Sequence, residues 1–113
     1  MSVRVHCNDP SALLNQINQK VREGSIDTWT IDSDGDFTHS PAQWKNKAWF
    51  RPRIETGQIL FRIIPAKGTR ITKAVYGVFH GRFIEMLISH FDEDFSVVTA
   101  TALAVTGTDV VVG

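Results

Sequence analysis

The sequence predicts a single α+β domain in which a mainly antiparallel sheet of about five or six strands carries two helices on one face. The 113 residues match one domain of ordinary size. Two stretches repeat apolar residues at three- and four-residue spacing, and several shorter runs alternate apolar with polar residues between glycine-containing turns. The expected order is β-α-β-β-β-β-α-β over residues 1–113 without linker or repeat, and residues 106–113 are expected to fray.

Residues 3–5 alternate valine with a polar residue, which is typical of a short strand. A helix follows, because Asn8 or Asp9 can cap its first turn and Pro10 suits the first helical position. Its apolar stripe consists of Leu13, Leu14, Ile17 and Val21. The helix is expected to end near Gly24.

Two hairpins are predicted next. Residues 26–31 alternate with period two and are expected to pair with 37–39 across a tight turn at Asp34-Gly35. Residues 40–46 form a loop or a single helical turn beginning at Pro41.

The second hairpin joins residues 47–54 to 58–64 through Glu55-Thr56-Gly57. Pro52 cannot donate a ladder hydrogen bond. It therefore indicates that the strand 47–54 lies at an edge of the sheet or contains a bulge.

Residues 71–91 fit a long helix better than the alternative, a strand to about Phe79 followed by a shorter helix from Gly81. The apolar face of this helix consists of Val75, Phe79, Phe83, Met86 and Leu87. Gly77 and Gly81 share an adjoining side with Ile84 and Ile88, and small residues at this spacing permit close packing. We expect the first helix to cover that side, with a second subunit as the alternative, so a homodimer is left open.

Residues 95–105 contain no charged side chain and are rich in valine and threonine. This composition predicts a strand in a rather central position of the sheet. Its face of small residues, on which three alanines follow Ser96 and Val98, would allow a helix to approach closely.

The formal net charge of zero excludes a protein that coats nucleic acid or anionic membrane by bulk charge. Between Lys45 and Lys73, however, eight basic residues stand against one acid, Glu55, so this segment carries +7 and the remainder −7. Cations interleaved with aromatic rings are typical of single-stranded nucleic-acid contact, although outward charges that pair with acids would give the same pattern. The predicted binding residues are Trp44, Lys45, Lys47, Trp49, Arg51, Arg53 and Arg62.

Several kinds of site are disfavoured. Cys7 has no second cysteine for a disulfide and is expected to be a buried structural residue. Residues 32–36 are interpreted as a turn rather than a calcium loop, because Phe37 and Gln43 occupy the positions at which an EF-hand has its glycine and its bidentate glutamate. No metal, no cofactor and no membrane contact is predicted. The chain lacks an apolar run long enough for a signal or a span, so we expect a soluble, cytoplasmic protein.

The leading hypothesis is a small non-enzymatic binding domain whose basic hairpin contacts an anionic partner, either a single-stranded nucleic acid or an acidic protein. The alternative is a small enzyme with a cleft built from His39, His80, Asp36 and Arg82. A third hypothesis is a subunit that only scaffolds a homo-oligomer.

Overall fold

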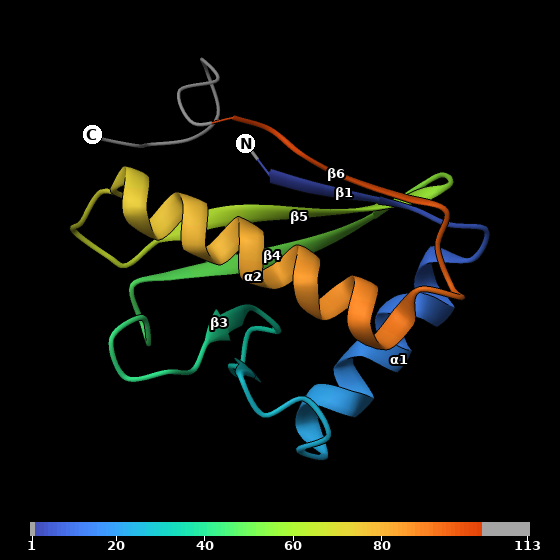
Figure 1. The fold of residues 1–113 in the computed structure, drawn as a ribbon, viewed down its shortest axis with the longest axis horizontal. Coiled ribbons are helices and arrows are strands. Elements are labelled where there is room, and N and C mark those ends of the chain that lie inside the picture. Colours follow the sequence, from blue (N-terminus) through green and yellow to red (C-terminus); the bar gives the residue numbers. More distant parts are fainter. Residues whose placement is uncertain (1, 103–113) are drawn as a thin grey trace.

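The computed structural model describes residues 2–102, which form six strands and two helices in the predicted order. The strands are β1 (Ser2–His6), β2 (Trp29–Ile31), β3 (Phe37–His39), β4 (Ala48–Glu55), β5 (Gln58–Pro65) and β6 (Val97–Ala100), and the helices are α1 (Pro10–Arg22) and α2 (Lys73–Phe91). The strand order is β2-β3-β4-β5-β1-β6, and every neighbouring pair is antiparallel (Figure 1). The predicted fold class is confirmed.

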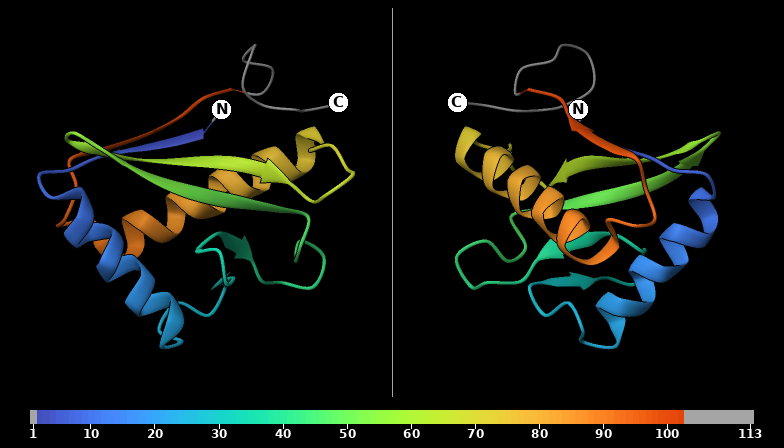
Figure 2. Two further views of the ribbon diagram at one scale, coloured as in Figure 1. Left: turned by 180° about the vertical axis from the view of Figure 1, so that it is seen from behind. Right: turned by 45° about the vertical axis from the view of Figure 1, so that its right-hand side comes forward.

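Both helices pack on one face of the sheet, and within residues 2–102 no helix covers the other face. In Figure 1, α2 crosses in front of β4 and β5, and in the reverse view of Figure 2 the same strands lie in front of α2. Alternate residues of the central strands point toward the helices and are fully buried, among them Val5, Phe50 and Phe61. The intervening residues of the same strands therefore form the uncovered face.

Phe83 of α2 lies at the centre of the core. Its ring centroid is 4.6 Å from that of Phe50, 4.7 Å from Phe61, 5.0 Å from Trp29 and 5.9 Å from Phe37. Four strands and the long helix thus meet at one aromatic cluster, whose tilted and edge-to-face geometry is the favoured arrangement of such rings.

The start of α1 shows which of the two candidate residues caps the helix. Asp9 is the N-cap, and its Oδ1 accepts a hydrogen bond of 3.1 Å from the backbone N–H of Ala12. The buried residues Leu13, Ile17 and Val21 then face the sheet, as the stripe predicts.

Replacing Asp9 with alanine is expected to lower the free energy of unfolding by about 1 kcal/mol, because the N–H of Ala12 loses its partner. Urea denaturation measures this difference. Asn8→Ala is the matched control and should leave stability nearly unchanged. Equal losses in the two variants would contradict the cap assignment.

The α2 segment is a continuous helix, capped by Thr72, whose Oγ1 accepts a hydrogen bond from the N–H of Val75. The expectation that α1 covers the glycine side of this helix is wrong. Gly77 and Gly81 are exposed, with nothing within 4 Å of where a Cβ would stand, and Ile88 is 51% exposed. The reason is that α1 packs mainly against β2, β4 and β5 rather than against α2.

The predicted central position of the last strand is also wrong. β6 is an edge strand that pairs with β1, and Val97 is half exposed there. The uncharged composition reflects an edge whose Val98 alone packs against the core, not burial on both sides. The expectations for residues 103–113, including a frayed end at 106–113, lie outside the described residues.

The local strand pairing explains why β4 can contain Pro52. β4 lies between β3 and β5, yet β3 pairs with it only at Phe37–Phe50 among the residues described, and Pro52 lies beyond that pairing. The proline is thus at an edge locally, although its strand is interior. Within residues 2–102, neither helix is long and apolar enough to cross a membrane.

Candidate functional site

The structure divides the seven predicted binding residues into two groups. Strand alternation places Trp49, Arg51, Arg53 and Arg62 on the uncovered face of the sheet. Trp44, Lys45 and Lys47 instead lie in the turn before β4, where the N–H of Lys45 donates to the carbonyl of Pro41 and closes one helical turn. The seven residues therefore belong to two basic surfaces and not to the single basic hairpin that the sequence predicted.

The uncovered face, which we call the arginine face, is organised by the strand register. Arg51 lies directly opposite Arg62, and Trp49 lies opposite Ile64. In the next row, Leu60 lies between Arg53 and Arg4, which β1 contributes. Leu60 is only 5% exposed, although no helix of residues 2–102 covers this face.

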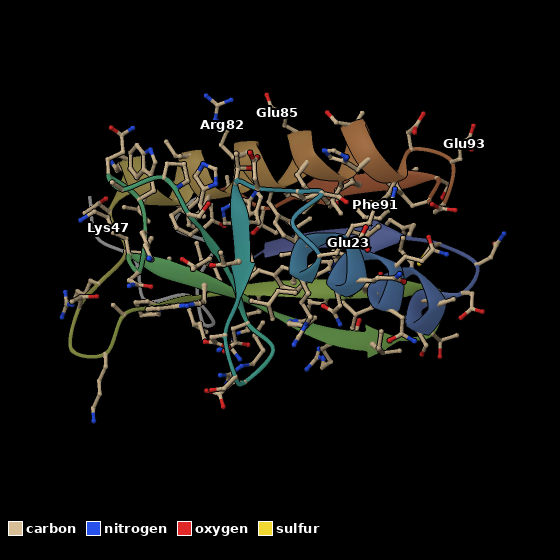
Figure 3. All side chains as sticks on the ribbon, turned by 90° about the horizontal axis from the view of Figure 1, so that it is seen from below. Glu23, Lys47, Arg82, Glu85, Phe91 and Glu93 are labelled. Carbon is tan, nitrogen blue, oxygen red and sulfur yellow. The ribbon has the colours of Figure 1, made fainter. Side chains whose placement is uncertain are left out.

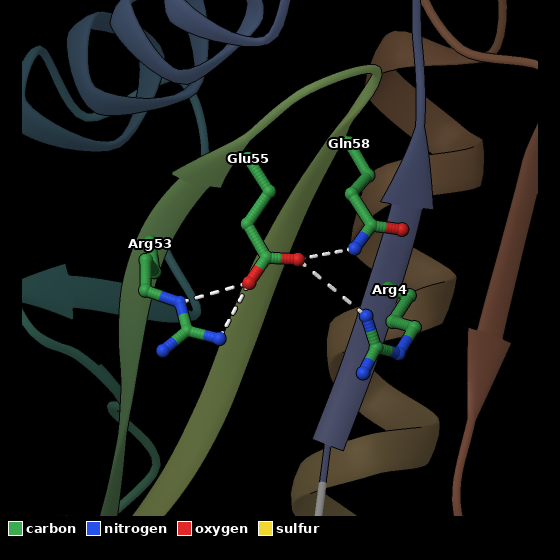
Figure 4. A network of polar contacts seen from close by, with 4 residues as sticks. All are labelled: Arg4, Arg53, Glu55 and Gln58. Carbon is green, nitrogen blue, oxygen red and sulfur yellow. Dashed lines mark hydrogen bonds and ion pairs between the residues drawn. The ribbon is translucent and has the colours of Figure 1, made fainter.

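Glu55 holds two of these arginines. Its carboxylate accepts a hydrogen bond of 2.9 Å from Arg53 Nε, forms an ion pair of 3.6 Å with Arg4, and accepts a hydrogen bond from Gln58 (Figure 4). The hydrogen bonds from Gln58 and Arg53 lower the pKa of Glu55. In Figure 4, these side chains lie in front of the strands while α2 passes behind, which places the network on the arginine face.

Asp36 fixes the third arginine. It accepts from Arg51 Nε at 3.0 Å and from Arg51 Nη2 at 2.8 Å, in the bidentate geometry that matches a guanidinium to a carboxylate. The carboxylate is 3% exposed whereas the arginine is 57% exposed, and this pairing raises the pKa of Arg51. The guanidinium plane is thus held by a buried anchor while Nη1 keeps its donors.

Among residues 2–102, the four arginines and two carboxylates of the arginine face sum to a net charge of +2. The other five cations of the basic segment surround the start of α2: Lys45, Lys47, Lys67, Arg70 and Lys73. Lys47 and Glu93 lie at opposite ends of the molecule (Figure 3), so Lys47, before β4, is far from Glu93, after α2.

A cleft of about 290 Å³ lies between α2 and the 41–47 turn, and His39 and Arg82 contribute to its wall. His39 is 5% exposed, and its Nδ1 donates a hydrogen bond of 2.8 Å to the carbonyl of Thr28. Since a carbonyl only accepts, Nδ1 carries the proton in the neutral ring and Nε2 is a lone-pair acceptor. Burial, the largest cause, lowers the pKa of His39, which favours that neutral form.

The structure does not bring the four residues of the enzyme hypothesis together. His80 stacks on Tyr76 at 3.9 Å and packs on Phe50 at 5.1 Å, away from the cleft, while Asp36 is held by Arg51. Arg82 shares the cleft wall with His39 but pairs with Glu85 at 3.2 Å (Figure 3). Ser89 also lines the cleft, but no hydrogen bond joins it to His39 in the described part of the chain. An activated nucleophile would need such a bond.

Cys7 and the acidic segment 32–36 were the two other candidate motifs, and the contacts of both are structural. Cys7 is buried, as expected, and burial raises the pKa of its thiol, which opposes a nucleophilic role. Residues 32–36 form the predicted turn, in which Asp32 accepts from the N–H groups of Asp34 and Asp36. Ligand oxygens of the three aspartates lie within 4.8 Å of one another, but Asp32 and Asp36 are already engaged in the turn and the arginine pair.

Comparison of the chain with protein-family models, with curated proteins and with solved structures gave no match. The interpretation of the site therefore depends on its geometry and charge.

Sequence reasoning missed four basic residues of these surfaces: Arg4, Lys67, Arg70 and Lys73. Arg4 joins the arginine face because β1 pairs with β5, and the alternation of residues 3–6 already placed its side chain opposite the buried valines. Arg70 was counted in the basic segment but not selected, because nothing in its local pattern shows that the chain folds back onto the 41–47 turn.

Proposed function

We propose that this protein is a non-enzymatic binding domain for single-stranded nucleic acid, which lies across the arginine face. The position of Arg51 directly opposite Arg62 carries the proposal. A phosphate backbone crossing the strands would be attracted by both.

The side chains between the arginines suit a nucleic acid better than an acidic protein. Trp49 and Ile64 form an apolar row beside the Arg51–Arg62 pair, and Leu60 lies between Arg53 and Arg4 in the strand register. Unpaired bases stack on aromatic rings and on guanidinium planes, and an open sheet face gives them room. Asp36 and Glu55 hold three guanidinium planes in place before binding, which reduces the entropy lost on association.

The test is fluorescence anisotropy with a labelled oligouridylate of about 12 nucleotides. If three arginines each contact one phosphate, affinity should fall about 20-fold between roughly 50 and 200 mM salt. The double variant Arg53→Gln/Arg62→Gln should weaken binding by about tenfold or more and reduce the salt dependence.

Arg22→Gln, on α1 and away from both basic surfaces, is the matched charge control and should bind as the unaltered protein does. Double-stranded DNA and a polyglutamate peptide are the competing ligands. Salt-independent binding, equal binding by the double variant, or tighter binding of polyglutamate would contradict the proposal.

A further inference from the structure

The second basic surface surrounds a cavity of its own. It has a volume of about 370 Å³ and lies where the 41–47 turn, the end of β5 and the start of α2 meet. The volume is within the range of about 300 to 1,000 Å³ that is common for small-molecule sites. The lining residues are Trp44, Asn46, Lys47, Ala66, Thr69, Arg70, Thr72, Ala74 and Val75.

All charged groups of this lining are positive. Lys47 and Arg70 contribute directly, and Lys45, Lys67 and Lys73 are each adjacent in sequence to a lining residue. None of the five forms an ion pair within residues 2–102, whereas Arg4, Arg51, Arg53 and Arg82 all do. Unpaired cations around a concavity create a positive potential that attracts an anion.

The N-terminal end of α2 adds to this positive potential, whose main source is the basic side chains. The first turn of the helix contains no acidic residue, and Thr72 caps only the N–H of Val75. The other backbone N–H groups of that turn carry partial positive charge, which has the same sign as the charge of the surrounding side chains.

Trp44 gives the cavity an aromatic wall. The residue is half-buried, lines both this cavity and the His39 cleft, and is fixed by hydrogen bonds from its own N–H and that of Lys45 to the carbonyl of Pro41. Asn46 then adopts φ of 61°, a left-handed conformation that asparagine tolerates, and Lys47 follows it at the cavity. The turn therefore presents a ring and a cation to the same space.

We propose that this cavity binds a mononucleotide, with the phosphate between Lys47 and Arg70 and the base against Trp44. Arginine and lysine are the side chains that proteins use for phosphate, and an aromatic ring accepts the face of any base. Adenine has no charge of its own that would be repelled by the five cations. The inference does not depend on the arginine face, since the two surfaces share none of their basic residues.

Isothermal titration calorimetry of the full chain with AMP, adenosine and inorganic phosphate tests the proposal. AMP should bind at least about tenfold more tightly than either of the other two, because only AMP uses both halves of the site. Lys47→Gln/Arg70→Gln should weaken AMP binding by about tenfold or more, and Trp44→Leu by about fivefold or more without changing the affinity for phosphate.

Arg22→Gln and the arginine-face variant Arg53→Gln/Arg62→Gln are the controls, and both should bind AMP as the unaltered protein does. The latter also separates the two proposals, because it removes oligonucleotide binding and spares AMP binding. Absence of AMP binding at millimolar concentration, equal affinity for phosphate and AMP, or unchanged binding by Lys47→Gln/Arg70→Gln would overturn the inference. Urea denaturation of each variant shows whether a loss comes from unfolding.

Discussion

Replacing Phe83 with alanine is expected to lower the free energy of unfolding by about 4 kcal/mol. The side chain is completely buried, and four aromatic rings from β2, β3, β4 and β5 have their centroids within 6 Å of its own. These rings come from separate strands and the sheet backbone fixes their positions, so they cannot close over the space that the missing ring leaves. Urea denaturation measures the loss, and the midpoint of thermal unfolding should fall by roughly 15 °C.

Ile88→Ala is the matched control for Phe83→Ala. It removes a large apolar side chain from the same helix, but at a position that is half exposed, so the expected loss is below about 1 kcal/mol. Phe83→Leu should be intermediate, since leucine fills part of the space. If Phe83→Ala cost no more than Ile88→Ala, the aromatic cluster would not be the centre of the core.

Local sequence patterns were sufficient to predict the helices and strands and part of the arginine face. Arg51 and Arg53 are two residues apart on one strand, so their shared face follows from strand alternation alone. Arg62 joins them because the turn at Gly57, with φ of 73°, sets the register of β4 against β5. A hairpin is a local structure, which is why this part could be predicted.

The pairing of strands that are distant in the sequence could not be predicted from local patterns. β1 lies between β5 and β6, and no local rule indicates that the first strand inserts there and leaves β6 at the edge. For the same reason, the sequence did not show that Trp44 and Trp49 lie on different surfaces. They are five positions apart, yet one lies in a turn that packs toward α2 while the other faces away from the helices. Their separation depends on where α2 docks, a property of the packed domain rather than of either segment.

Acid is expected to destabilise this protein through His80, by about 2 to 3 kcal/mol between pH 7.5 and 4.5. The ring is buried, its Nδ1 donates a hydrogen bond of 2.7 Å to the carbonyl of Tyr76, and its Nε2 has no partner. Burial, the largest cause, lowers the pKa of His80 to about 4. In the unfolded chain the pKa is about 6.5, so the unfolded state takes up the proton first as pH falls. The stabilisation is therefore complete above pH 6.5 and is lost between about 6.5 and 4.

The variant His80→Phe keeps an aromatic ring between Tyr76 and Phe50 but cannot take up a proton. Urea denaturation at pH 7.5 and 4.5 should show that this variant loses about 2 to 3 kcal/mol less than the unaltered protein over that interval. His90→Gln, an exposed position on the same helix, is the matched control and should retain the full loss. Glu55, whose pKa is lowered, and His39 act in the same direction but are present in all three proteins, so their contributions cancel in the comparison. Equal acid sensitivity of His80→Phe and the unaltered protein would mean that His80 is already protonated in the folded state at pH 4.5, or is not buried as the structure shows.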